Sequence, residues 1–83
     1  MIATAELGDC TISVTTQDHE PDRYLVSVVG LDGVANPRSG SYSYDQIVSL
    51  SCARGAIVLG CHILRLAASI RRKADRAWRK AAA

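Results

Sequence analysis

Long hydrophobic runs are scarce in this sequence of 83 residues. The longest apolar stretch, Gly55 to Leu64, is well short of the roughly 18 residues that a membrane-spanning helix needs. Met1 is followed by no basic region and no apolar block, so no signal peptide is predicted. We therefore expect a cytosolic protein, and a hydrophobic content of 48% is enough for a single folded domain over residues 1–83.

Cysteine is scarce as well, and the odd count of three argues against a disulfide framework. On a single helix, Cys52 and Cys61 would point to opposite faces and could not pair. Cys61 and His62 are adjacent, but no CxxC or HxxxH spacing completes a zinc site. The cysteines are interpreted as small buried hydrophobic residues, and no metal is predicted.

The motifs that carry catalysis are missing: there is no GxSxG, no P-loop, no HExxH and no dinucleotide fingerprint. His19 lies between two acids and is interpreted as a solvated loop residue, and His62 as a half-buried core residue. The acidic loop around Glu20 lacks the spacing of an EF-hand. The sequence predicts no enzyme, no catalytic residue and no cofactor.

Charge is divided unevenly along the chain. Residues 1–53 hold seven acids and two arginines, a net charge of −5. Residues 54–83 hold eight basic residues and one acid, Asp75, a net charge of +7. The stretch IRRKADRAWRK at 70–80 alone has six cations. This division predicts an anionic partner for the basic part.

Residues 2–43 have the pattern of an antiparallel meander of three or four strands. CTISVTT alternates apolar and polar residues, RYLVSVVGL is rich in β-branched residues, and IATAEL is a further edge strand that turns at Gly8-Asp9. Asp32-Gly33 is a hairpin signal. The strand after it is interrupted by Asn36-Pro37 and Ser39-Gly40, so a short or irregular edge strand is predicted.

A single long helix is predicted over residues 44–80, which makes the fold class α+β. SYDQ matches a capping box with Ser43 at the N-cap, and no proline follows. At 100° per residue an apolar seam runs along one side, and arginines fill a band about 60° wide on the other. A break or kink near Gly55 or Gly60 is the main alternative. The seam is Val48, Cys52, Ala56, Leu59, Ile63, Leu66, Ile70, Ala74 and Ala77, and the arginines are Arg54, Arg65, Arg72, Arg76 and Arg79.

Such a helix would be longer than the sheet beneath it. A six-residue strand of about 20 Å covers about 13 helical residues, whereas residues 44–80 would span about 55 Å. The uncovered part of the seam then needs a homodimer, a chain that folds back, or a partner. The predicted partner-binding residues are Tyr44, Arg65, Leu66, Ile70, Arg72, Arg76, Trp78, Arg79 and Lys80. A solvated helix end that favours the helix dipole is the alternative interpretation of the basic stretch.

Two functions remain open. The first is a small protein-binding inhibitor that docks on a larger protein or ribonucleoprotein complex and acts by steric occlusion. The second is a nucleic-acid-binding protein that places the basic helix on the phosphate backbone. A helix that lies on a membrane is disfavoured, because the seam weakens to alanine where the charge rises.

In size and element order, residues 10–65 resemble several small phage-encoded anti-CRISPR proteins. The resemblance rests on strands at CTISVTT and RYLVSVVGL, a DG hairpin and a capped helix from SYDQ. It implies a non-enzymatic inhibitor, in the cytosol of an infected host cell, that blocks target DNA or nuclease recruitment. The basic extension departs from the acidic members that mimic DNA, and favours occlusion or contact with an acidic protein surface.

Overall fold

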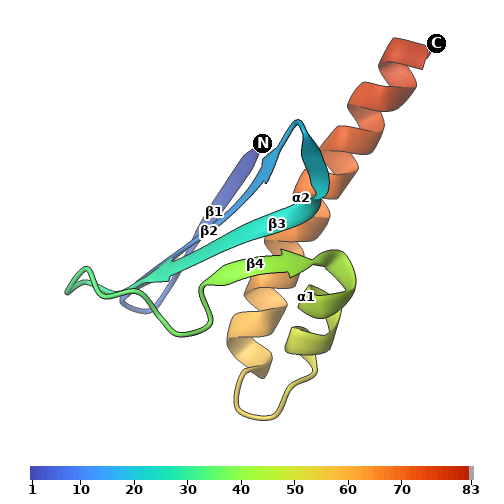
Figure 1. Cartoon of the computed structure of the whole chain (residues 1–83). Coiled ribbons are helices and arrows are strands. Elements are labelled where there is room, and N and C mark those ends of the chain that lie inside the picture. The colour runs from blue at the N-terminus through green and yellow to red at the C-terminus, as the bar shows by residue number, and fades with distance from the viewer. Residues whose placement is uncertain (83) are drawn as a thin grey trace.

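The computed structural model describes residues 1–82 as a four-stranded antiparallel sheet followed by two helices (Figure 1). The predicted α+β class, with a sheet followed by a long C-terminal helix, is confirmed. Strand order in the sheet follows the chain, as in a meander. The elements are β1 (Ile2–Leu7), β2 (Cys10–Gln17), β3 (Glu20–Val29), β4 (Gly40–Ser43), α1 (Tyr44–Ser51) and α2 (Ile57–Ala82).

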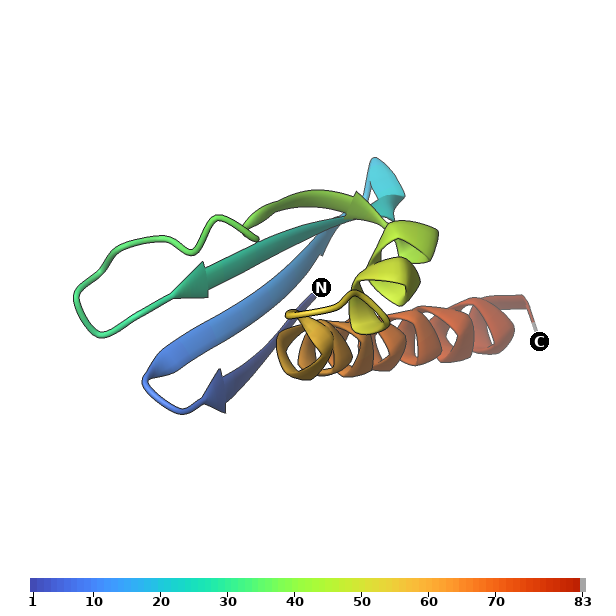
Figure 2. The same ribbon diagram turned by 90° about the horizontal axis from the view of Figure 1, so that it is seen from below.

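Both helices cover the same face of the sheet (Figure 2). The alternation in β2 puts Ile12 and Val14 on this face, where both are fully buried. Val26 and Val28 of β3 pair with them and complete the floor of the core. The opposite face carries small polar side chains such as Ser13 and stays uncovered.

Turn residues set the two ends of the meander. Gly8 has φ +60°, which suits the first central position of the two-residue turn between β1 and β2. At the other end, the amide of Gly33 donates to the carbonyl of Gly30, and only Gly33 of the Asp32-Gly33 pair has a positive φ. The predicted short edge strand after this loop is β4, with four residues.

The predicted capping box begins α1. The Ser43 hydroxyl accepts a hydrogen bond from the Gln46 amide at 3.2 Å, and the Gln46 side chain accepts one from the Ser43 amide at 2.7 Å. Together they satisfy backbone donors that the first turn of a helix leaves free.

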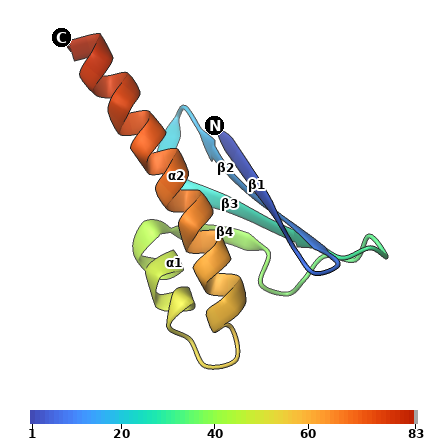
Figure 3. The ribbon, with the colours of Figure 1, turned by 180° about the vertical axis from the view of Figure 1, so that it is seen from behind.

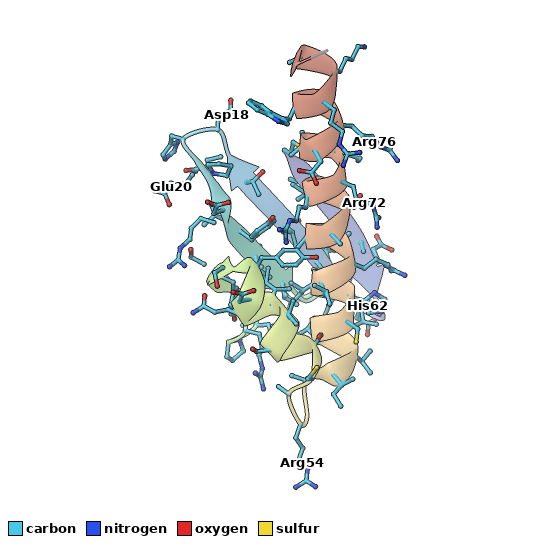
Figure 4. All side chains as sticks on the ribbon, turned by 90° about the vertical axis from the view of Figure 1, so that its right-hand side faces the viewer. Asp18, Glu20, Arg54, His62, Arg72 and Arg76 are labelled. Atoms are coloured by element: carbon cyan, nitrogen blue, oxygen red, sulfur yellow. The ribbon has the colours of Figure 1, made fainter. Side chains whose placement is uncertain are left out.

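The prediction of one continuous helix is wrong: the chain reverses between α1 and α2, and the alternative of a break near Gly55 is the structure observed. Gly55 has φ +82°, which only glycine adopts at little cost. The reversal lays α1 beside α2 (Figure 3). Arg54 therefore lies in the connection and points away from the molecule, apart from the other arginines (Figure 4).

Gly60 is the point of closest approach between the two helices. A Cβ atom at Gly60 would lie 2.6 Å from the carbonyl carbon of Leu50 and 2.7 Å from the amide nitrogen of Ser51. The glycine that weakens a continuous helix is thus what allows two helices to touch.

The middle of α2 supplies side chains that pack against the sheet from the helix side of the core. Ile63 is fully buried, and burial continues to Ile70, which is 2% exposed. The predicted seam is thus covered from Ala56 to Ile70, whereas Val48 and Cys52 are exposed.

Candidate anion-binding site

The last part of α2 extends beyond the domain. Residues 71–81, here called the basic tail, are all exposed, and they project beyond the sheet as a free helix (Figure 1). Eleven residues at 1.5 Å each correspond to about 16 Å of helix. Alanine, arginine and lysine are good helix formers, and Arg79 and Lys80 in the last turn interact favourably with the helix dipole.

Arginines line one side of this helix. Arg65, Arg72, Arg76 and Arg79, here called the arginine ridge, are all exposed and lie within a band about 60° wide at 100° per residue. From Arg65 to Arg79 the ridge extends about 21 Å along α2. Figure 4 shows Arg72 and Arg76 on the side of α2 that faces away from the sheet hairpin carrying Asp18 and Glu20.

The charges of the tail are not neutralised by the protein itself. Within residues 1–82, no carboxylate lies within 4.0 Å of a cation of the tail; the one pair of basic and acidic side chains within that distance is His19 and Glu20, at 3.8 Å. A hollow of about 220 Å³ opens on the ridge, lined by Arg72, Asp75, Arg76 and Arg79. These guanidinium groups are therefore free to bind an external anion.

Acidic groups gather on the other flank of α2. Asp22, Asp45 and Asp75 line a hollow of about 510 Å³ where the tail leaves the domain, together with Arg71 and Tyr44. Asp75 also lines the hollow on the ridge, so Asp22 and Asp45 are the carboxylates that belong to this flank alone, and they disfavour an anion there relative to the ridge.

Tyr44, which was predicted to bind a partner, has contacts within the domain. Its ring is half-buried: the guanidinium carbon of Arg71 lies 4.4 Å from the ring centroid, and the Tyr24 ring packs 5.8 Å away. This contact fixes the base of the tail to the first turn of α1. Burial raises the pKa of the Tyr24 phenol above its ordinary 10.0, and the nearby Arg71 charge partly opposes that shift.

Leu66 and Ile70, which were predicted to bind a partner, are buried within the domain. They are 8% and 2% exposed, because the sheet and α1 already cover that side of α2. The part of the seam from Ala56 to Ile70 is therefore covered within the domain, whereas Ala74 and Ala77 remain exposed. The remaining predicted residues of the tail are exposed, and Trp78 is 74% exposed.

Models of protein families, curated proteins and solved structures were compared with the chain. None of them matches it.

Two side chains near the basic tail make contacts that the sequence analysis did not predict. Arg71 belongs to the same basic stretch, but its contact with Tyr44 depends on the reversal of the chain, and no local pattern announces it. His62 is half-buried as predicted, and its Nδ1 accepts a hydrogen bond from the Arg65 guanidinium at 3.1 Å. This bond orients the first arginine of the ridge.

The cysteines differ from their prediction as buried residues. Cys52 and Cys61 are exposed and Cys10 is half-buried, and all three are free thiols. Within residues 1–82, no group of three or more His, Cys, Asp or Glu side chains could hold a metal ion. Neither helix of the described chain is long and apolar enough to cross a bilayer.

Proposed function

We propose that this chain is a non-enzymatic binding protein whose arginine ridge holds the phosphate backbone of a nucleic acid. One observation carries the proposal: in the part of the chain that the structure describes, four arginines without ion pairs share one exposed side of α2, and three of them lie beyond Ile70, the last residue described as buried. Arginine suits this task because its planar fork can donate two hydrogen bonds to one phosphate.

The dimensions of the tail support a duplex ligand. Arg72 and Arg76 are about 6 Å apart along the axis, and Arg76 and Arg79 about 4.5 Å. A free α-helix of about 10–12 Å diameter fits a major groove about 12 Å wide. Because the tail projects about 16 Å, a groove can receive it before the sheet meets the duplex.

The burial of the seam supports the same ligand class. The interior of a protein–protein interface is apolar and depleted of charge. With Leu66 and Ile70 in the core, the tail offers a protein partner little apolar surface besides Trp78.

Trp78 nevertheless favours a second candidate, the small inhibitor that docks on an acidic surface of a larger complex, as the resemblance to anti-CRISPR proteins implies. Tryptophan and arginine dominate the binding energy at protein interfaces, and Trp78 stands 74% exposed on the basic tail, about 130° around α2 from the middle of the ridge at 100° per residue. If this candidate is right, the protein inhibits the larger complex and Trp78→Ala abolishes that inhibition. If the protein only binds nucleic acid, neither the wild type nor Trp78→Ala inhibits the complex.

A salt titration tests the proposal. Binding of a labelled duplex, followed by fluorescence anisotropy, should weaken with a slope of about −0.9 per phosphate contacted in a plot of log K against log salt concentration. The triple variant Arg72→Gln, Arg76→Gln, Arg79→Gln should reduce that slope by about 3.

The matched control removes the same charge elsewhere. Arg23, Arg38 and Arg54 are exposed and lie outside the ridge, so their replacement by Gln should leave the slope unchanged. An equal loss of slope in both triple variants would show that net charge alone binds the duplex. Absence of binding to duplex and single strands at about 0.1 M salt would overturn the proposal.

A further inference from the structure

The two edges of the sheet are not equally protected. β4 is four residues long, follows a loop that contains Pro37, and runs directly into α1. β1 is six residues long and has no proline, no lysine and no bulge in its pairing with β2. Its one charged residue is Glu6. An edge without such protection is a site where another strand can pair.

The hydrogen bonds of β1 show which backbone groups are free. Met1 and Thr16 exchange both hydrogen bonds, at 3.0 and 2.8 Å. In an antiparallel ladder, bonded and non-bonded pairs alternate, so Ala3 and Ala5 bond to β2. The N–H and C=O groups of Ile2, Thr4 and Glu6 consequently point away from β2, where no other strand lies.

From this edge we infer that the chain forms a twofold symmetric dimer in which β1 pairs antiparallel with β1 of a second copy. A register centred on Thr4 places Thr4 opposite its equivalent and Ile2 opposite Glu6. The twofold axis repeats the second pairing as Glu6 opposite Ile2, which makes three pairs. Each pair exchanges two hydrogen bonds, for a total of about six. The edge is therefore complementary to itself, as a twofold interface requires.

Charge is compatible with this pairing. The first turn of α2 lies near Leu7, at the C-terminal end of β1, and α2 then runs toward the N-terminal end of the strand (Figure 1). The twofold axis stands perpendicular to the sheet, so the two basic tails leave in opposite directions and do not repel each other. Both helix layers lie on the same face of the joined sheet.

The mass in solution tests the inference without nucleic acid, so its outcome is independent of the proposed function. The wild type should sediment with twice the chain mass of 8.9 kDa at sub-millimolar concentration. Thr4→Pro removes an amide that faces outward and should sediment with the mass of one chain. Thr4→Ala keeps that amide and should remain a dimer.

Two results would overturn the inference. If the wild type has the mass of one chain at every concentration, the dimer does not form and the edge of β1 could pair only with a strand of another protein. A Thr4→Pro variant that stays dimeric would place the interface elsewhere. Circular dichroism shows whether Thr4→Pro folds. If it does not fold, the test uses Thr4→Cys in a chain whose native cysteines are changed to serine.

The oxidant diamide should link two copies of the Thr4→Cys variant by a disulfide. Ser41→Cys on β4 is the control and should not be linked. Failure of Thr4→Cys to form the disulfide overturns the inference.

Discussion

At the scale of single residues, Gly60 separates the observed fold from a continuous helix. In an uninterrupted helix, Gly60→Ala would stabilise the protein by up to about 1 kcal/mol. In the observed fold the added Cβ meets the backbone of Leu50 and Ser51, so we expect a loss of about 1–3 kcal/mol. Urea unfolding measures the difference. Ala77→Gly, on the exposed tail, reports helix propensity alone, and a more stable Gly60→Ala variant would contradict the packing of α1 on α2.

Tyr24 makes stability sensitive to alkaline pH. Because its pKa is raised in the fold, the neutral phenol is favoured, and this contribution is fully present below pH 10.0 and lost as pH rises through the folded pKa. The free energy of unfolding of Tyr24→Phe should therefore fall less steeply than that of the wild type above about pH 10. Urea unfolding at a series of pH values measures both curves, and parallel curves up to about pH 11 would contradict the prediction.

At the scale of elements, the basic tail is separable from the domain. It covers no part of the core, so removal of residues 74–83 should change the free energy of unfolding by about 0.5 kcal/mol or less. Arg71 remains in this variant and keeps its contact with Tyr44. Duplex binding should weaken and the salt slope should fall by about 2, because Arg76 and Arg79 of the ridge are removed while Arg65 and Arg72 remain. Unchanged binding in the anisotropy assay would place the anion site outside residues 74–83.

The elements also show what the sequence can and cannot predict. The capping box at Ser43 and the alternation of β2 are local patterns, and both were correctly predicted. One side of α2 is buried from Ile63 to Ile70, and both the sheet and α1 contribute to that burial.

The reversal itself was not predictable from periodicity. Two helices that pack on the same core each have an apolar side. The apolar periodicity in the sequence can therefore look like that of one continuous helix even though the chain is broken. The deciding facts are a positive φ at Gly55 and the close approach at Gly60, and both depend on tertiary contacts. The burial of Leu66 and Ile70 follows from the same reversal.

At the scale of the whole molecule, the proposed dimer would carry two arginine ridges on one face. Linking two binding surfaces raises affinity because the second contact becomes intramolecular. Thr4→Pro should therefore lower duplex affinity by about tenfold or more and roughly halve the salt slope. Anisotropy titrations of Thr4→Pro and Thr4→Ala measure both effects. An unchanged slope in a monomeric variant would mean that one ridge makes all the phosphate contacts.

Both ends of the described chain, residues 1–82, lie next to surfaces to which we assign binding. Met1 continues directly into the free edge of β1, and the far end of α2 carries Arg79 and Lys80. A purification tag or fluorescent fusion at either terminus would thus obstruct strand pairing or mask the cations. The connection between β3 and β4 is the better graft point: Leu31 there is 85% exposed, and the loop protrudes at the opposite end of the molecule (Figure 1).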